Sequence, residues 1–150
     1  DILFFSEKNT ININIELKPN HGFEIKNVKA VAELLKNFNF KNQYFFSSFD
    51  WPSLFAMKEF LPNSYYCLLI DKFSHDISLK NIIEVCNRYD FNFCGFNKNI
   101  LNQDILSEMK KYKFIITSYS EKNFNLNEAK ELWSIGVDSL FIDDPSEFNL

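Results

Sequence analysis

The stretch Asn12-Ile13-Asn14-Ile15-Glu16-Leu17-Lys18-Pro19 alternates polar and apolar residues. A period of two is typical of a β-strand, because successive side chains of a strand point to opposite faces. One face would carry Ile11, Ile13, Ile15 and Leu17, and the other Asn12, Asn14, Glu16 and Lys18. Proline has no N–H to donate, so Pro19 ends the strand. Glu16 and Lys18 therefore leave the strand end together, either into a common site or into solvent, where charged residues most often lie.

Strand and helix patterns alternate along the rest of the chain. Short apolar runs predict strands at 44–49, 65–71, 91–96, 113–119 and 137–143. Apolar residues at helical spacing predict helices at 24–38, 54–60, 79–89, 103–111 and 128–135. The expected helix caps are Asp50, Ser53, Ser78 and Asn127 at N-termini and Gly136 at a C-terminus. Residues 1–5 read as the end of a helix, and a further helical turn is expected near Pro145.

Strands separated by helices at these intervals favour a parallel sheet with helical crossovers. Two architectures fit this pattern, a doubly wound open sheet and a (β/α)8 barrel. The open sheet usually has a glycine-rich phosphate-binding turn after a strand, and this chain, with 3 glycines, has none. No linker or change in composition interrupts the chain, so residues 1–150 are expected to form one domain.

Composition and charge exclude some classes of partner. The net charge of −4 without a run of Lys or Arg argues against a nucleic-acid surface, which needs a basic footprint. There is no apolar run of about 18 residues, so neither a membrane span nor a signal peptide is predicted. Cys67, Cys86 and Cys94 form no C-x-x-C pair. We therefore expect buried, reduced thiols and a cytoplasmic location.

The segment Ile15-Glu16-Leu17-Lys18-Pro19 resembles the Glu-x-Lys-Pro strand of the glycerophosphodiester phosphodiesterase family, in its short bacterial cytoplasmic type. Similar segments follow in the family's order: Ser47-Ser48-Phe49, Leu61-Pro62 with Leu68-Leu69-Ile70-Asp71, and Gly136-Val137-Asp138 with Phe141-Ile142-Asp143. The resemblance runs from Thr10 to Phe148 and implies an α/β fold of the (β/α)8 TIM-barrel type. It assigns about six βα units to this chain, as strands three to eight. The first two strands are absent from it, so the domain is expected to be truncated at its N-terminus. Because a barrel closes only with all its strands, we expect the isolated chain to self-associate.

The resemblance also implies a phosphodiester hydrolase. Its substrate would be a small glycerophosphodiester, such as glycerophosphocholine, and its products sn-glycerol 3-phosphate and an alcohol. Glu16 matches the family's metal-binding glutamate, and Mg²⁺ or Ca²⁺ would suit its carboxylate because both prefer oxygen ligands. Lys18 matches the basic catalytic residue that places positive charge on the phosphate. Ser48, Phe49 and Asn97 are expected to contact substrate, because barrel enzymes carry their chemistry at the C-terminal ends of strands.

Parts of the family pattern have no counterpart in this chain. They are the His-Arg-Gly turn, the paired acidic metal ligands and the second histidine, so the isolated chain is expected to be inactive. His21 and His75 match neither histidine and are expected to be surface imidazoles. The run Ile116-Thr117-Ser118-Tyr119-Ser120 replaces the family's Trp- or Tyr-Thr-Val-Asn run, which leaves substrate preference open. For Ser48, Asn97 and Asp143, hydrogen bonding to nearby backbone is the alternative role.

Two other functions remain open. One is a non-catalytic, barrel-derived module that binds a partner, and the other is a different TIM-barrel hydrolase or isomerase that shares only the polar strand. A His-Arg-Gly turn encoded upstream would favour the phosphodiesterase over the binding module. Hydrolysis of glycerophosphocholine by the full-length protein would separate it from other barrel enzymes.

Overall fold

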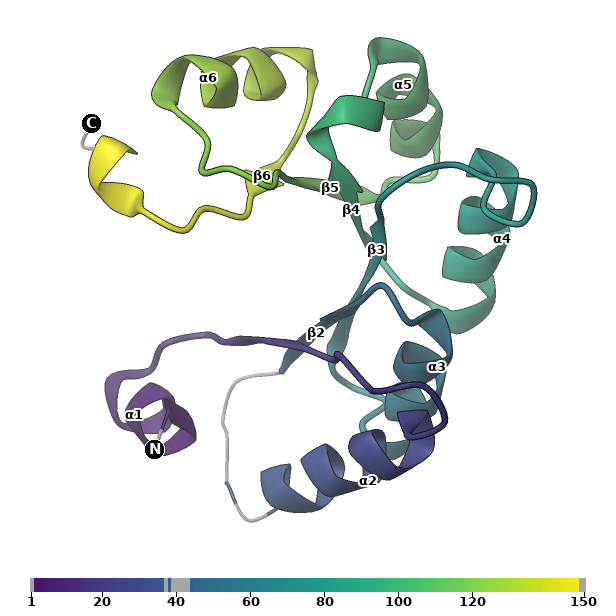
Figure 1. Ribbon diagram of the computed structural model, residues 1–150, viewed down its shortest axis with the longest axis vertical. Helices are drawn as coiled ribbons and strands as arrows, with labels where there is room; N and C mark the ends of the chain where they lie inside the picture. The colour runs from purple at the N-terminus through teal and green to yellow at the C-terminus, as the bar shows by residue number, and fades with distance from the viewer. Residues whose placement is uncertain (1, 37, 39–43, 149–150) are drawn as a thin grey trace. The chain divides into compact units, whose positions relative to one another are not determined.

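The computed structural model describes residues 2–36, 38 and 44–148 (Figure 1). Asp1 and Asn37, which fall within two of the predicted helices, lie outside the described residues. The chain divides into two compact units, Asp1–Leu68 and Leu69–Leu150, which we call unit 1 and unit 2. The boundary falls inside strand β3 (Tyr65–Ile70). That residues 1–150 form one domain stays a prediction.

Helices and strands alternate in unit 1. Its elements are α1 (Ile2–Asn9), β1 (Asn14–Glu16), α2 (Glu24–Leu35), β2 (Phe45–Ser48), α3 (Trp51–Phe60) and the first part of β3. β1 pairs in parallel with β2, where Glu16 lies opposite Ser47, and β2 pairs in parallel with β3. The C-terminal ends of β1 and β2 therefore lie side by side at one edge of the sheet.

The core of unit 1 is built around two stacked aromatic rings. Phe46 and Tyr66 are both buried, and their ring centroids are 5.6 Å apart. The Tyr66 hydroxyl donates to the carbonyl oxygens of Leu61, at 2.7 Å, and Met57, at 3.1 Å. Burial raises the pKa of the Tyr66 phenol well above its usual value, so the hydroxyl stays a donor. These bonds fix the C-terminal end of α3 on the sheet.

An apolar hollow of about 570 Å³ opens between α1, β1 and α2. We call it the α1 groove. It is lined mainly by aliphatic side chains, among them Ile2, Ile13, Ile15 and Leu34. Ile2 is 72% exposed and Leu34 51%, so the groove is open to solvent.

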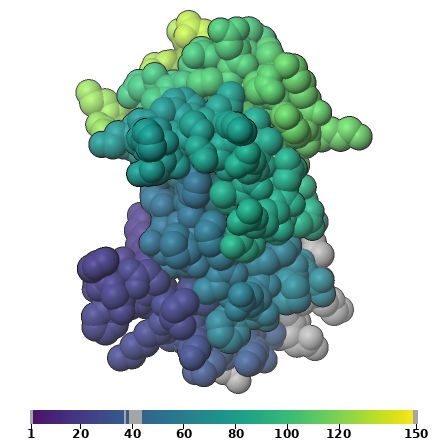
Figure 2. All heavy atoms as spheres, turned by 90° about the vertical axis from the view of Figure 1, so that its right-hand side faces the viewer, coloured from purple at the N-terminus to yellow at the C-terminus, as the bar shows by residue number. Residues whose placement is uncertain are grey.

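Unit 2 continues the alternation. Its elements are the end of β3, α4 (Leu79–Tyr89), β4 (Phe93–Asn97), the short 3-10 helix η1 (Lys98–Ile100), α5 (Gln103–Lys111), β5 (Ile115–Tyr119), α6 (Leu126–Ile135), β6 (Ser139–Leu140) and η2 (Pro145–Phe148). β4 pairs in parallel with β5, and β5 with β6. On the face drawn in Figure 2, the outer surface of unit 2 is formed by α4 and α5, in teal and green. The strand order is β1-β2-β3-β4-β5-β6, which excludes the doubly wound alternative because that fold reverses its strand order.

Helix capping confirms some of the predicted boundaries and corrects others. α4 and α5 have the predicted bounds, and Ser78 caps α4 in a capping box with Asn81. The prediction of Ser53 as a cap is wrong. Asp50 caps α3, which begins at Trp51, because its Oδ2 accepts the Ser53 N–H at 3.0 Å.

The predicted cap of the last long helix is also wrong. Asn125, not Asn127, is the N-cap of α6: its Oδ1 accepts the N–H groups of Asn127 and Glu128, each at 3.0 Å. The Glu128 carboxylate accepts the Asn125 N–H in return, at 3.2 Å, and completes a capping box. Gly136 ends the helix with φ of 109°, in the left-handed region predicted for a glycine C-cap.

Several elements are shorter than predicted, among them β1, β2, β3 and β5, and the difference is clearest in α2 and β6. α2 ends at Leu35 rather than at 38, and β6 spans two residues rather than 137–143. After β6, the Asn123 side chain accepts the N–H groups of Asp143, at 2.9 Å, and Asp144, at 3.2 Å. The chain therefore turns away from the sheet into η2.

All three cysteines are buried free thiols, as predicted. The Sγ atoms of Cys86, on α4, and Cys94, on β4, are 3.4 Å apart. Within the described ranges, no helix has the length and apolar character needed to cross a membrane.

Candidate functional site

The C-terminal end of β1 is held by backbone contacts at one buried residue. Leu17 is only 2% exposed, and its N–H donates to the Ser47 carbonyl at 2.8 Å. Its own carbonyl accepts the Ser48 hydroxyl at 2.6 Å. Because Leu17 points inward, its neighbours Glu16 and Lys18 project from the opposite face, as the alternation of the sequence predicts.

Glu16 and Lys18 lie together at this strand end. Lys18 Nζ is 3.2 Å from Glu16 Oε2, and the side chains are 73% and 31% exposed, respectively. An ion pair this exposed contributes at most about 1 kcal/mol to stability, so stability does not explain the arrangement. It places a carboxylate, which can bind a metal ion, beside an ammonium group, which can bind an anion, and both are in contact with water.

Ser48 is fully buried, and its hydroxyl is engaged by the backbone on both sides. It donates to the Leu17 carbonyl and accepts the Asp50 N–H at 2.9 Å. This is the alternative, structural role considered for Ser48 in the sequence. The next residue, Phe49, is 47% exposed and is the aromatic side chain that follows β2.

In unit 2, side chains from three successive strand ends meet at one carboxylate. Asp71 follows β3, Asn97 ends β4 and Tyr119 ends β5. Asp71 Oδ1 accepts a hydrogen bond from Asn97 Nδ2 at 2.8 Å and one from the Tyr119 hydroxyl at 3.3 Å. We call these three residues the Asp71 cluster. Asn97 also caps η1, accepting the Asn99 N–H at 3.0 Å, so the turn-forming role considered for it is present as well.

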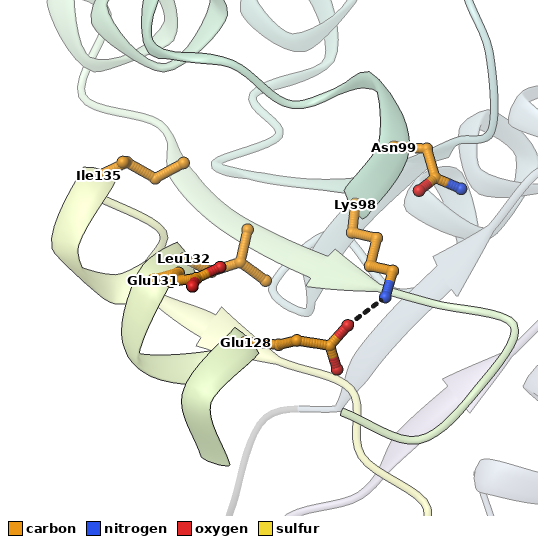
Figure 3. Close-up of a pocket in the computed structure, with 6 residues that line it drawn as sticks. All are labelled: Lys98, Asn99, Glu128, Glu131, Leu132 and Ile135. Carbon is orange, nitrogen blue, oxygen red and sulfur yellow. Dashed lines mark hydrogen bonds and ion pairs between the residues drawn. The ribbon is translucent and has the colours of Figure 1, made fainter. Parts of the chain in front are cut away.

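A second polar contact in unit 2 joins η1 to α6 (Figure 3). Lys98 Nζ lies 2.7 Å from Glu128 Oε1, beside a hollow of about 390 Å³ that Glu131, Leu132 and Ile135 also line. The hydrogen bond from Lys98, followed by that from the Asn125 N–H, holds the pKa of Glu128 below its usual range. The two opposite charges neutralise each other, so this ion pair links η1 to α6. Sequence analysis did not predict this pair, because the partners are 30 positions apart.

The residues that sequence analysis named are divided between the two units. Glu16, Lys18, Ser48 and Phe49 belong to unit 1, and Asn97 belongs to unit 2. His21 and His75 are fully exposed, as predicted, and each contacts a neighbouring carboxylate, Glu24 at 3.7 Å and Asp76 at 3.1 Å. Asp143 is exposed, and the carboxylate that holds the following turn is that of Asp144, which accepts the Ser146 N–H at 2.9 Å.

The described residues do not build a metal site by themselves. Among them, no three His, Cys, Asp or Glu side chains gather closely enough to hold an ion. Glu16 offers one carboxylate, already paired with Lys18, whereas Mg²⁺ and Ca²⁺ take about six or more oxygen ligands. A divalent ion at Glu16 would therefore need further ligands or many waters.

No family model matches the sequence, and a search of curated proteins finds no match. Solved structures do match the fold. An Oleispira antarctica phosphodiesterase, in complex with its product sn-glycerol-3-phosphate, has a TM-score of 0.77 at 20% identity, over 89% of this chain and 52% of that one. A candidate glycerophosphoryl diester phosphodiesterase from Silicibacter pomeroyi has a TM-score of 0.79 at 15% identity, over 97% of this chain and 52% of that one. A glycerophosphodiester phosphodiesterase from Parabacteroides distasonis has a TM-score of 0.67 at 15% identity, over 89% of this chain and 53% of that one.

The fold matches part of a TIM barrel. Parallel strands in chain order, each followed by a helix, are what a (β/α)8 barrel repeats, and the sequence prediction of this α/β class is confirmed. The chain spans about half the length of these solved structures. At such low identity the similarity to glycerophosphodiester phosphodiesterases is one of fold.

Proposed function

We propose that the chain is part of a glycerophosphodiester phosphodiesterase. The parent protein would hydrolyse a small glycerophosphodiester to sn-glycerol 3-phosphate and an alcohol. The observation that carries this proposal is the pairing of Glu16 with Lys18, 3.2 Å apart at the C-terminal end of β1. The fold supports it, because barrel enzymes place their chemistry at this end of the strands. The buried reduced cysteines agree with the cytoplasmic location proposed for the protein.

Each proposed site residue has a task that follows from its chemistry. Hydrolysis adds water to phosphorus and breaks the bond to the alcohol oxygen, which takes up a proton. Lys18 would bind a non-bridging oxygen and offset the negative charge that the phosphoryl group carries. Ser48 holds the Leu17 carbonyl and so positions both side chains. Phe49 and Asn97 are proposed to contact substrate.

Glu16 is proposed as one ligand of a divalent cation, Mg²⁺ or Ca²⁺. Such an ion, when bound, would neutralise charge on the phosphate. Since one carboxylate does not make a site, such an ion would need further ligands or many waters. The isolated chain is accordingly expected to show no hydrolysis.

The test is hydrolysis of glycerophosphocholine by the whole gene product, measured as release of sn-glycerol 3-phosphate with and without chelator. We expect Glu16→Gln and Lys18→Met each to lower kcat/KM by about 100-fold or more, since each removes a charge placed at the phosphate. The matched control is Glu84→Gln, an exposed carboxylate on α4 paired with Lys80, which should keep wild-type turnover.

Two results would contradict the proposal. If Glu16→Gln keeps wild-type activity, Glu16 has no role in the site. A folded gene product that hydrolyses no glycerophosphodiester, with or without added Mg²⁺ or Ca²⁺, would favour the non-catalytic binding module.

A further inference from the structure

Two thiols of unit 2 lie in contact with each other. Cys86 is in the last turn of α4 and Cys94 is in β4, and their Sγ atoms are 3.4 Å apart. Both residues are buried, at 1% and 0% exposed. We call them the Cys86–Cys94 pair. Both belong to unit 2, so the contact lies within one compact part of the chain.

The backbone holds both cysteines in place. The Cys86 carbonyl accepts the N–H of Asp90, the C-cap of α4, and the N–H of Phe91 at 2.9 Å. Asp90 has a left-handed conformation, with φ of 55°, which ends the helix and turns the chain toward β4. Cys94 lies in the ladder between β4 and β5, opposite Ile116. The two sulfurs are therefore carried by a fixed helix end and a fixed strand.

The distance between the sulfurs is short enough for a bond to form by small movements. A disulfide has about 2.0 Å between its sulfur atoms. Starting from 3.4 Å, each sulfur would have to move by about 0.7 Å, which is within the displacement of about 0.9 Å of a well-ordered protein atom. Packing alone explains why two small apolar side chains are buried, but it does not require their sulfurs to touch.

We propose that the Cys86–Cys94 pair is an oxidation site that forms a reversible disulfide with a hydroperoxide, such as hydrogen peroxide. One sulfur attacks a peroxide oxygen, the O–O bond breaks, and a sulfenic acid and one water result. The second sulfur then attacks the sulfenic sulfur, the S–O bond breaks, and the leaving hydroxide takes up the thiol proton as a second water. Two thiols lose two electrons in all, and one peroxide is reduced to two waters.

The burial of the pair decides how the oxidation proceeds. With both side chains at 1% exposed or less, peroxide reaches a sulfur only when the α4 end of unit 2 opens locally. Once a sulfenic acid has formed, the second sulfur is already beside it, so the intramolecular step outcompetes further oxidation to sulfinic acid. The disulfide would link the last turn of α4 to β4, and a dithiol would restore the two thiols by exchange.

The test uses the whole gene product in its folded state, treated with hydrogen peroxide. The remaining thiols are blocked with N-ethylmaleimide in denaturant, and the protein is digested with trypsin. Cleavage after Lys80, Arg88 and Lys98 places Cys86 in peptide 81–88 and Cys94 in peptide 89–98. We expect mass spectrometry to find these peptides joined, at about 2 Da below their summed mass, and separate again after reduction with a dithiol.

The three cysteines allow matched substitutions. Cys86→Ala and Cys94→Ala should each abolish the joined peptide. The control is Cys67→Ala, which replaces an equally buried thiol of unit 1 and should leave the yield of the joined peptide unchanged. If the variants at 86 and 94 fail to fold, the wild-type measurement still decides, because trypsin separates the two cysteines of the unmodified chain.

Two results would overturn the proposal. One is peroxide treatment that leaves Cys86 and Cys94 on separate peptides, whether blocked by maleimide or oxidised to sulfinic acid. The other is a disulfide that joins either of them to Cys67 or to a cysteine elsewhere in the gene product. Neither result bears on the proposed phosphodiesterase activity, because that proposal uses neither cysteine. Absence of hydrolysis would likewise leave the oxidation site standing.

Discussion

At the scale of single residues, the end of β1 depends on one buried hydroxyl. Ser48 joins the Leu17 carbonyl to the Asp50 N–H and has no contact with water. Sequence analysis considered two roles for this serine, contact with substrate and hydrogen bonding to nearby backbone. The structure shows the backbone hydrogen bonds. The pairing of Glu16 with Lys18 could be predicted from alternation alone, because residues two apart on a strand share a face. The convergence of Asn97 and Tyr119 on Asp71 could not, because it depends on strand register and side-chain rotamers.

Ser48→Ala should destabilise the protein by about 1–3 kcal/mol, because it leaves the buried Leu17 carbonyl and the partly buried Asp50 N–H without this partner. Urea unfolding measures the change. The control is Ser107→Ala on α5, whose exposed side chain makes no hydrogen bond within the described chain and which should shift stability by no more than about 0.5 kcal/mol. Equal effects of the two substitutions would show that the Ser48 bonds contribute nothing.

At the scale of elements, local chemistry decided which predictions succeeded. α4 and α5 have the predicted bounds because each starts at a polar cap and carries one apolar stripe. α6 was placed two residues late because Asn125 and Asn127 are equally good caps by type. Only the backbone geometry, extended at Asn125, selects between them. The short β6 was not predicted, and the segment after it is held by Asn123, a residue distant in sequence.

The two asparagines near the start of α6 give a matched pair of substitutions. Asn125→Ala should cost about 0.5–2 kcal/mol of unfolding free energy, because it removes the acceptor for two helical N–H groups. Asn127→Ala should cost little, since the structure gives its exposed side chain no cap role. Chemical denaturation of both variants checks this. A larger loss of unfolding free energy in Asn127→Ala than in Asn125→Ala would instead identify Asn127 as the N-cap, as sequence analysis predicted.

At the scale of the whole molecule, apolar surface is exposed around the α1 groove. Ile2, Phe4 and Phe5 of α1 are 72%, 61% and 58% exposed, and Ile11 is 44% exposed. Exposed apolar side chains of this size favour association. The family resemblance predicted the barrel-type strand order and the association. It could not predict the division into units, since nothing in the composition changes near residue 68.

Residues 1–150 in isolation are therefore expected to self-associate. Sedimentation velocity at micromolar concentration should show species larger than the 17.8 kDa monomer. Replacing Phe4 and Phe5 with serine should shift the population toward monomer, because it removes exposed apolar surface from α1. A monodisperse, cooperatively melting wild-type monomer would contradict the prediction.

The position of the boundary within β3 limits how the protein can be dissected. A genetic or proteolytic cut between Leu68 and Leu69 would sever a buried strand and leave each product with part of a hydrogen-bonded ladder. Fragments for separate study would have to begin or end in the connections that flank the strand, at 61–64 or 71–78. Even then, only one of the two pieces could keep the strand intact.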